Sequence, residues 1–200
     1  VGGAKKKRGS GPAFKTVELD VREVPHINAS LSDKIDVAIA TRLPVNYGVS
    51  YTGQYPRHNG FMLDAADGEV LLRDPENSDV VKRFMVGDDL LTTGTTSRYV
   101  IDFQTLDILS AQAYKGPFAR LSETVLPHVR ALAAAEREST QKAVGQDQSW
   151  LQTWWQHFRC RPELIRKLGT ISRYLACSRI TKRPIFVFVD ATIRPGDALQ

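Results

Sequence analysis

The chain has 200 residues, of which 42% are hydrophobic and 24% charged, with a formal net charge of +5. This size and composition predict one globular domain with a real core, and the lack of any run of 18 apolar residues excludes a membrane-spanning helix. Residues 1–22 carry a net charge of +4, residues 23–150 of −5 and residues 151–200 of +6, a distribution that favours one positive surface for phosphate polyanions unless it serves solubility alone.

The first 45 residues are interpreted as an appendage to the main domain. Lys and Arg at positions 5–8 are followed by Gly, Ser and Pro, which predicts a basic flexible linker over residues 1–13. A phosphate-binding arm is the alternative. Residues 14–45, which begin with a strand-like alternation up to Val21, are interpreted as a segment connecting an upstream catalytic domain to the main domain at 46–200.

Strands are expected early in the main domain. Residues 46–63 are rich in glycine and tyrosine and predict two strands around a turn at 56–60. Asp74 and Pro75 predict the start of a helix, with Gly87 as its end. Residues 98–103 again have the composition of a strand.

A helical middle follows. Residues 105–113 predict a helix capped by Thr105 and broken at 116–117, and residues 118–138 predict a second helix that Pro127 kinks or divides. Residues 162–168 predict a third helix.

Two further strands are predicted near the end of the chain, at residues 171–180 and 185–189, on either side of a basic turn. The predicted fold is therefore mixed α+β, with strands at the two ends around a helical middle. The last residues, 195–200, suggest no closing element, and together with a first residue other than Met this is typical of a piece of a longer polypeptide.

No catalytic, metal-binding or cofactor-binding residue is predicted in this chain. It has no glycine-rich loop after a strand and no Pro-Pro pair for gripping a flipped adenine. The adjacent acids Asp88 and Asp89 suit a turn or a helix cap better than a metal site, so a metal-dependent nuclease is the weakest alternative. Cys160 and Cys177 lack metal-ligand spacing and are interpreted as reduced thiols of a cytosolic protein, although the sequence leaves a disulfide open.

Six strings occur in a fixed order after residue 45. They are residues 46–53 with 60–63, 74–77 with 84–90, 98–103, 111–130, 154–164 and 178–182. Together they resemble the target-recognition domain of Mme-type (type IIG/IIL) single-chain restriction–modification enzymes. The departures are local, at 85–86 and 93–96.

The resemblance implies a target-recognition-domain-like fold and a division of labour. An upstream domain of the same polypeptide would bind S-adenosylmethionine and methylate adenine at N6, and the resemblance also allows a nuclease fused to it. The present chain would grip double-stranded DNA and read its sequence in the bacterial cytoplasm, away from any membrane. The alternative is a standalone nucleic-acid-binding regulatory protein.

Side chains with several hydrogen-bond donors on protruding turns are the best candidates for reading bases. The predicted DNA-binding residues lie in the basic turn near the end, in the aromatic segment before it and in the early turn, and they are Ser178, Arg179, Thr181, Lys182 and Arg183; Arg159, Arg161 and Trp155; and Tyr51, Gln54 and Arg57. Ion pairing, solvation or core packing is the alternative for each. Since Trp154 and Trp155 would face different sides of a helix, only one of them is expected in the core.

Overall fold

The computed structural model describes residues 21, 23–28, 31–34, 36, 39, 41, 43–139, 144–182 and 184–200. The chain forms two compact units, Val1–Tyr47 and Gly48–Gln200. The first contains the 3-10 helix η2 (Pro44–Asn46). The predicted linker at 1–13 and the predicted strand at 14–20 lie outside the described residues.

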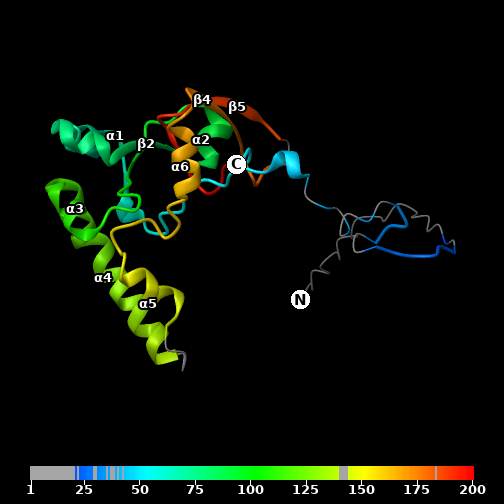
Figure 1. Cartoon of the computed structure of the whole chain (residues 1–200), viewed down its shortest axis with the longest axis horizontal. Coiled ribbons are helices and arrows are strands. Elements are labelled where there is room, and N and C mark those ends of the chain that lie inside the picture. Colours follow the sequence, from blue (N-terminus) through cyan, green and yellow to red (C-terminus); the bar gives the residue numbers. More distant parts are fainter. Residues whose placement is uncertain are drawn as a thin grey trace, which may run out of the picture. The chain divides into compact units, whose positions relative to one another are not determined.

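The second unit is mixed α+β, as predicted: along the chain, the helical middle is preceded and followed by strands (Figure 1). Its elements are η3 (Asn59–Phe61), β1 (Met62–Leu63), α1 (Ala65–Leu71), η4 (Pro75–Asp79), β2 (Val81–Met85), α2 (Gly87–Thr92), β3 (Tyr99–Ile101), α3 (Ile108–Ala113), α4 (Lys115–Ser139), α5 (Gln146–Leu151), α6 (Pro162–Leu168), β4 (Arg173–Cys177), β5 (Phe186–Asp190) and β6 (Arg194–Pro195). No helix in the described part of the chain is long and apolar enough to cross a membrane.

Four strands form the main sheet, in the order β1-β3-β2-β6. Strand β3, predicted from its β-branched and aromatic residues, pairs antiparallel with both β1 and β2. The fourth strand, β6, pairs parallel with β2, so that Phe84 lies opposite Arg194. The end of the chain is thereby part of the sheet.

Two predictions for residues 46–87 are wrong. The helix predicted from Asp74 to Gly87 stops at η4, because residues 81–85 form a strand that pairs with β3 and β6, and Gly87 begins α2. The hairpin predicted over 46–63 does not form. Gln54 and Tyr55, in its first predicted strand, bridge to Gly196 and Arg159 and not to the second predicted strand. Pairing with distant segments overrides the local strand pattern in both places.

The helical middle is confirmed with different boundaries. Helix α3 is capped by Asp107, whose carboxylate accepts from the Ser110 N–H, rather than by Thr105. The predicted break between the two helices is present but lies at Tyr114. Helix α4 starts at Lys115 and includes Gly116 and Pro117, because a proline in the first turn costs no hydrogen bond. Nor does Pro127 divide α4, which is continuous through this residue.

The main core lies between the sheet, α4 and an aromatic segment at 150–158. Helix α4 contributes residues spaced four apart, namely Leu121, Val125, Val129 and Ala133. Trp154 and Trp155 are both only 7% exposed, and their rings meet edge to face with centroids 6.1 Å apart. The expectation that only one would pack is wrong, because both lie in a turn after α5 and not in a helix.

The last seven residues are held firmly, contrary to the expectation of no closing element. Leu199 is fully buried and packs with Met85 and Leu90. The N–H of Gly53 donates to the carbonyl of Leu199 at 3.0 Å. Gly53 passes so close to Gly196 that a Cβ on Gly53 would lie 2.1 Å from the Gly196 carbonyl oxygen. Only glycine allows this crossing of two backbone segments.

Candidate nucleic-acid interface

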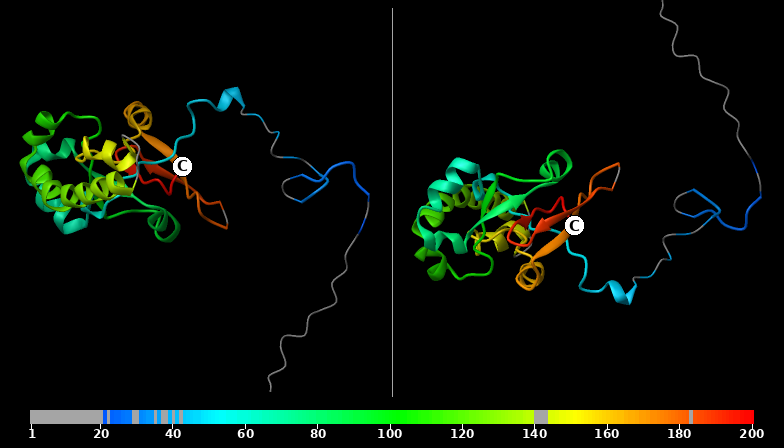
Figure 2. Two further views of the ribbon diagram at one scale, coloured as in Figure 1. Left: turned by 90° about the horizontal axis from the view of Figure 1, so that it is seen from below. Right: turned by 90° about the horizontal axis from the view of Figure 1, so that it is seen from above.

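The two predicted late strands, β4 and β5, form an antiparallel hairpin. Ala176 and Val189 on its inner face pack against Met85, Leu90 and Leu199. The loop joining the strands extends away from the helices (Figure 2). We refer to residues 178–185, which connect β4 to β5, as the hairpin tip.

The base of the hairpin tip is fixed to the end of the chain. Ser178 bridges to Leu199, and the N–H of Arg179 donates to the carbonyl of Ala198 at 2.8 Å. The Arg179 guanidinium donates through Nη1 to the carbonyl of Asp197 at 3.0 Å. One donor of five is thus used to orient the side chain. The others remain for a ligand, because Arg179 is exposed.

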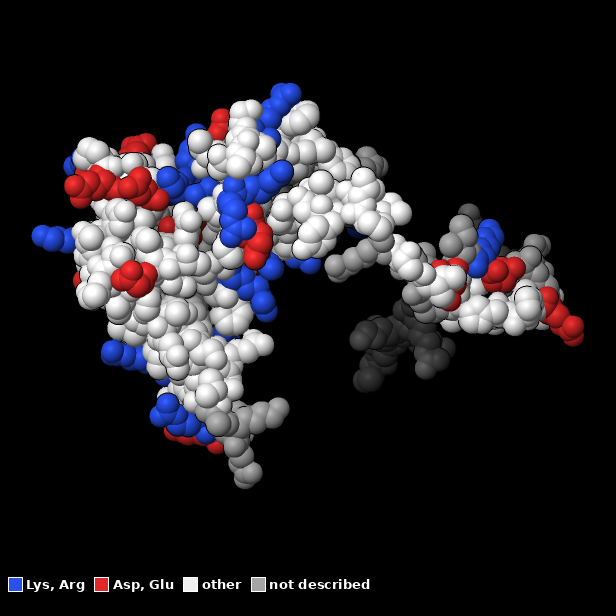
Figure 3. Space-filling model, in the orientation of Figure 1, with Lys and Arg blue, Asp and Glu red and all other residues white. Residues whose placement is uncertain are grey.

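Further cations near the hairpin were not singled out from the sequence. Arg166 and Lys167 occupy the last turn of α6, and Arg173 begins β4, where its guanidinium lies 4.4 Å from the centre of the Phe188 ring. Lys and Arg gather over α6 and the hairpin, with fewer Asp and Glu among them (Figure 3). The sequence pattern that could have indicated these cations is the adjacent pair Arg166 and Lys167 at the end of a short predicted helix.

The cations of this surface differ from four others in the second unit, which carboxylates neutralise. Arg57, Arg98, Arg120 and Arg194 each pair with a carboxylate of this unit. By contrast, no carboxylate among the described residues lies within 4.0 Å of the charged groups that we define as the basic surface, which belong to Arg166, Lys167, Arg179 and Lys182. Cations that no carboxylate neutralises are available to phosphate oxygens.

The structure does not bring all predicted residues to this surface. Arg57 lies in a second cluster, where it pairs with Asp147 and its guanidinium carbon is 4.5 Å from the centre of the Phe158 ring. The guanidinium carbon of Arg159 also lies over this ring, 5.3 Å from its centre. Arg161 has a left-handed backbone (φ 55°) and donates from Nε to the Gly53 carbonyl at 3.4 Å. Arg57 therefore links the early segment to α5, and Arg161 links the start of α6 to Gly53.

Three predicted DNA-binding side chains are buried, namely Gln54, Trp155 and Ser178, which corrects the expectation that they are exposed. Gln54 is completely buried, and Trp155 donates from Nε1 to the carbonyl of Leu106 at 2.9 Å. Ser178 is only 6% exposed, and its hydroxyl donates to the Ile180 carbonyl. Thr181 is half-buried and Lys182 exposed, whereas Arg183 lies outside the described residues.

Gln54 belongs to a buried polar cluster that no local sequence pattern indicates. Its amide donates to Asp102 Oδ2 at 3.1 Å, and the Arg194 Nε lies 3.4 Å from the same oxygen. His157 Nδ1 lies 3.8 Å from Asp102 Oδ1, and its Nε2 lies 2.9 Å from the Ile101 carbonyl. Burial lowers the pKa of His157, more than the nearby carboxylate raises it. This cluster ties β6 to the core and is closed to substrates.

Groups capable of other chemistry are engaged in structural roles. Asp88 and Asp89 lie in the first turn of α2, as predicted, and Asp89 accepts from the Val86 N–H and pairs with Arg98. Within the described residues, no three His, Cys, Asp or Glu side chains are placed to hold a metal ion. Cys160 and Cys177 are free thiols, and burial raises the pKa of Cys160 to about 11.

Comparison with known proteins gives one informative likeness. No protein-family model matches the chain, and no curated protein does. Among solved structures, the chain is similar to the Type IIL restriction-modification enzyme MmeI in complex with DNA, with a TM-score of 0.54 and 18% sequence identity. The likeness covers 88% of this chain and 22% of that enzyme. The chain therefore has the fold of a part of a restriction-modification enzyme and spans about a fifth of its length.

Proposed function

We propose that this chain is the sequence-reading, DNA-binding module of a larger restriction–modification enzyme that methylates adenine. The observation that carries the proposal is the fold shared over 88% of the chain with an enzyme whose structure is in complex with DNA. The basic surface supports it independently, because cations without carboxylate partners favour a polyanion.

The hairpin tip is proposed to read bases. It projects from the body, and Arg179 is held by the backbone of Asp197 while most of its donors remain free. An arginine oriented in this way suits the paired acceptors of guanine in the major groove. Lys182 at the tip, with Arg166 and Lys167 on α6, would contact phosphates and set the orientation of the duplex.

Catalysis is proposed to belong to another domain of the same polypeptide. That domain would bind S-adenosylmethionine, transfer its methyl group to the adenine N6 and work in the bacterial cytoplasm. A fused nuclease would add cleavage. The side chains of the present module would hold the duplex in register for that domain and supply no reacting group.

Equilibrium binding tests the proposal. Fluorescence anisotropy of the chain with a labelled random-sequence duplex should show binding that weakens linearly with the logarithm of salt concentration. The variant Arg179→Ala/Lys182→Ala should weaken binding and reduce the steepness of this dependence by about 1, since Lys182 is the phosphate contact of the pair and each such contact contributes roughly 0.9.

A matched control is Arg130→Ala, which removes an exposed cation from α4. The control should bind like the unmodified chain. Failure of the chain to bind any duplex at low salt, or equal losses for the hairpin and α4 variants, would contradict the proposal.

A further inference from the structure

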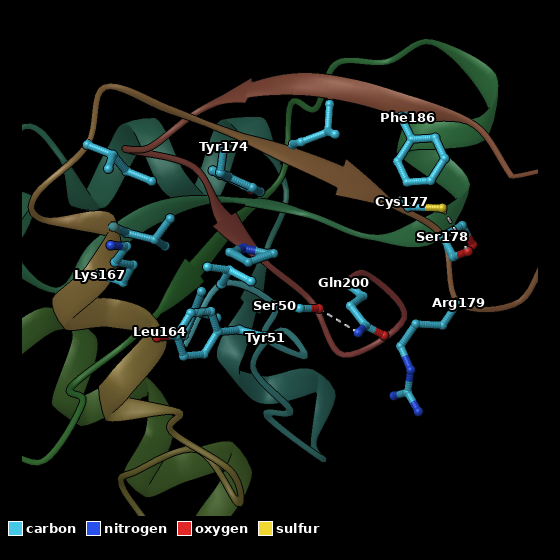
Figure 4. Close-up of a pocket in the computed structure, with 15 residues that line it drawn as sticks. Ser50, Tyr51, Leu164, Lys167, Tyr174, Cys177, Ser178, Arg179, Phe186 and Gln200 are labelled. Carbon is cyan, nitrogen blue, oxygen red and sulfur yellow. Dashed lines mark hydrogen bonds between the residues drawn. The ribbon is translucent and has the colours of Figure 1, made fainter. Parts of the chain in front are cut away.

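A cavity of about 540 Å³ opens beside the hairpin tip. It lies between the segment at 49–51, helix α6, strand β4 and the end of the chain (Figure 4). This volume falls within the range of small-molecule pockets. The cavity is part of neither the main core nor the buried polar cluster around Asp102.

The walls of the cavity are aromatic and aliphatic. Tyr51, Tyr174 and Phe186 come from three different segments, and Leu164 and Leu168 come from one side of α6. The hydroxyl of Tyr51 donates to the Gly48 carbonyl, and that of Tyr174 donates to the Ile193 carbonyl at 3.1 Å. These bonds fix both rings, so the cavity presents preformed flat surfaces. Such surfaces suit a planar heterocycle.

The rim of the cavity is polar and positively charged. Lys167 and Arg179 both line it, and both belong to the basic surface. The Gln200 amide donates to Ser50 Oγ at 2.7 Å, and Figure 4 shows Gln200 between Ser50 and Arg179. No described residue donates to the Gln200 amide oxygen, which is therefore available to a donor on a ligand. An apolar pocket with cations at its edge suits a base attached to phosphates.

We propose that this cavity receives one unstacked nucleobase of the bound DNA. The base would stack on the aromatic walls, Lys167 would hold a flanking phosphate, and Arg179 at the rim would keep its contact with a neighbouring base. The inference rests on the proposed DNA binding and extends it. An apolar side chain of another protein would also fill the cavity, but it would draw nothing from the two cations at the rim, and Arg179 already belongs to the proposed DNA surface.

The test compares two duplex pools with randomised flanks, one fully paired and one with a single central T·T mismatch. Unstacking costs less at a mismatch, so the chain should bind the mismatched pool several-fold more tightly. Phe186→Ala should remove this preference and weaken binding of the mismatched pool by about tenfold, within the range for loss of one base stack.

The chain offers matched controls for each variant. Phe188 lies on the same strand and is 63% exposed, against 62% for Phe186, but it does not line the cavity. Phe188→Ala should keep the preference. Lys167→Ala should weaken binding more than Arg166→Ala, because Arg166 is adjacent on α6 but lies outside this cavity.

The outcomes distinguish failure of the base-binding cavity from failure of the proposed DNA-binding function. Normal binding of paired duplexes without a mismatch preference would overturn the base-binding cavity and leave the proposed function intact. Equal losses for Phe186→Ala and Phe188→Ala would also overturn it, since the whole apolar face of the hairpin would then be responsible, as for a protein partner. Absence of all DNA binding would overturn both proposals.

Discussion

Asp102 should be among the residues on which stability depends most. It is 1% exposed, and it is the only carboxylate of the described residues that pairs with the largely buried Arg194. Asp102→Asn keeps the shape and removes the charge, so that Arg194 stays buried without a counter-ion. Breaking a buried ion pair from one side costs about 3–5 kcal/mol of the free energy of unfolding. For a domain of this size, that corresponds to a Tm lower by roughly 6–20 °C.

The assay is urea and thermal denaturation followed by circular dichroism, with a second variant as the decisive comparison. Asp102→Asn/Arg194→Met removes both charges and should recover part of the lost free energy, because no charge is then left unpaired. A loss below about 1 kcal/mol for the single variant, or a double variant less stable than the single one, would refute the reasoning that the pair is electrostatically coupled.

Three further predictions follow from single contacts. Gly53→Ala should destabilise the fold by at least about 1–3 kcal/mol, because its Cβ would meet the Gly196 carbonyl; a denaturation midpoint equal to that of the unmodified chain would contradict this crossing. Since burial lowers the pKa of His157, the unfolded chain binds a proton there before the folded chain does, and the free energy of unfolding should fall as pH drops below about 6.5. For His157→Gln, the free energy of unfolding measured by urea titration should differ less between pH 7.5 and pH 5.5 than for the unmodified chain. An equal difference would contradict the role of His157. Cys160, whose pKa burial raises to about 11, should react with iodoacetamide far more slowly in the folded chain than in urea, as mass spectrometry would show.

The sequence was sufficient where local pattern and tertiary environment agree. Helix α6 has Pro162 at its start and Leu164 and Leu168 buried four residues apart. The β4–β5 hairpin has strand-forming residues on both sides of a basic turn, and β3 is strongly β-branched and aromatic. Each of these elements was predicted and is confirmed.

The sequence was insufficient where distant pairing decides. Residues 81–85 have a spacing that fits a helix, but they become a strand because β3 and β6 supply partners on both sides. Gln54 is polar and lies in a segment with the composition of an exposed turn. It is nevertheless buried, and its amide donates to the carboxylate of Asp102, 48 positions later. No local pattern encodes such a contact.

The candidate site was predicted only in part for the same reason. Arg179 and Lys182 were predicted as candidates because they lie in a basic turn between two strands. Lys167 reaches the same cavity as Arg179 only through the packing of α6 on the hairpin, by Leu164, Leu168 and Tyr174. Trp155 was misplaced because the segment after α5 is a turn and both tryptophans enter the core.

Selection from a randomised duplex library tests the central claim, that this chain reads DNA sequence, most directly. The chain should enrich one defined sequence motif over several rounds. Arg179→Ala/Lys182→Ala should change or abolish the motif, whereas Arg130→Ala should enrich the same motif as the unmodified chain. Enrichment of no motif, or of an identical motif by the hairpin variant, would contradict the assignment of the hairpin tip as the reading element.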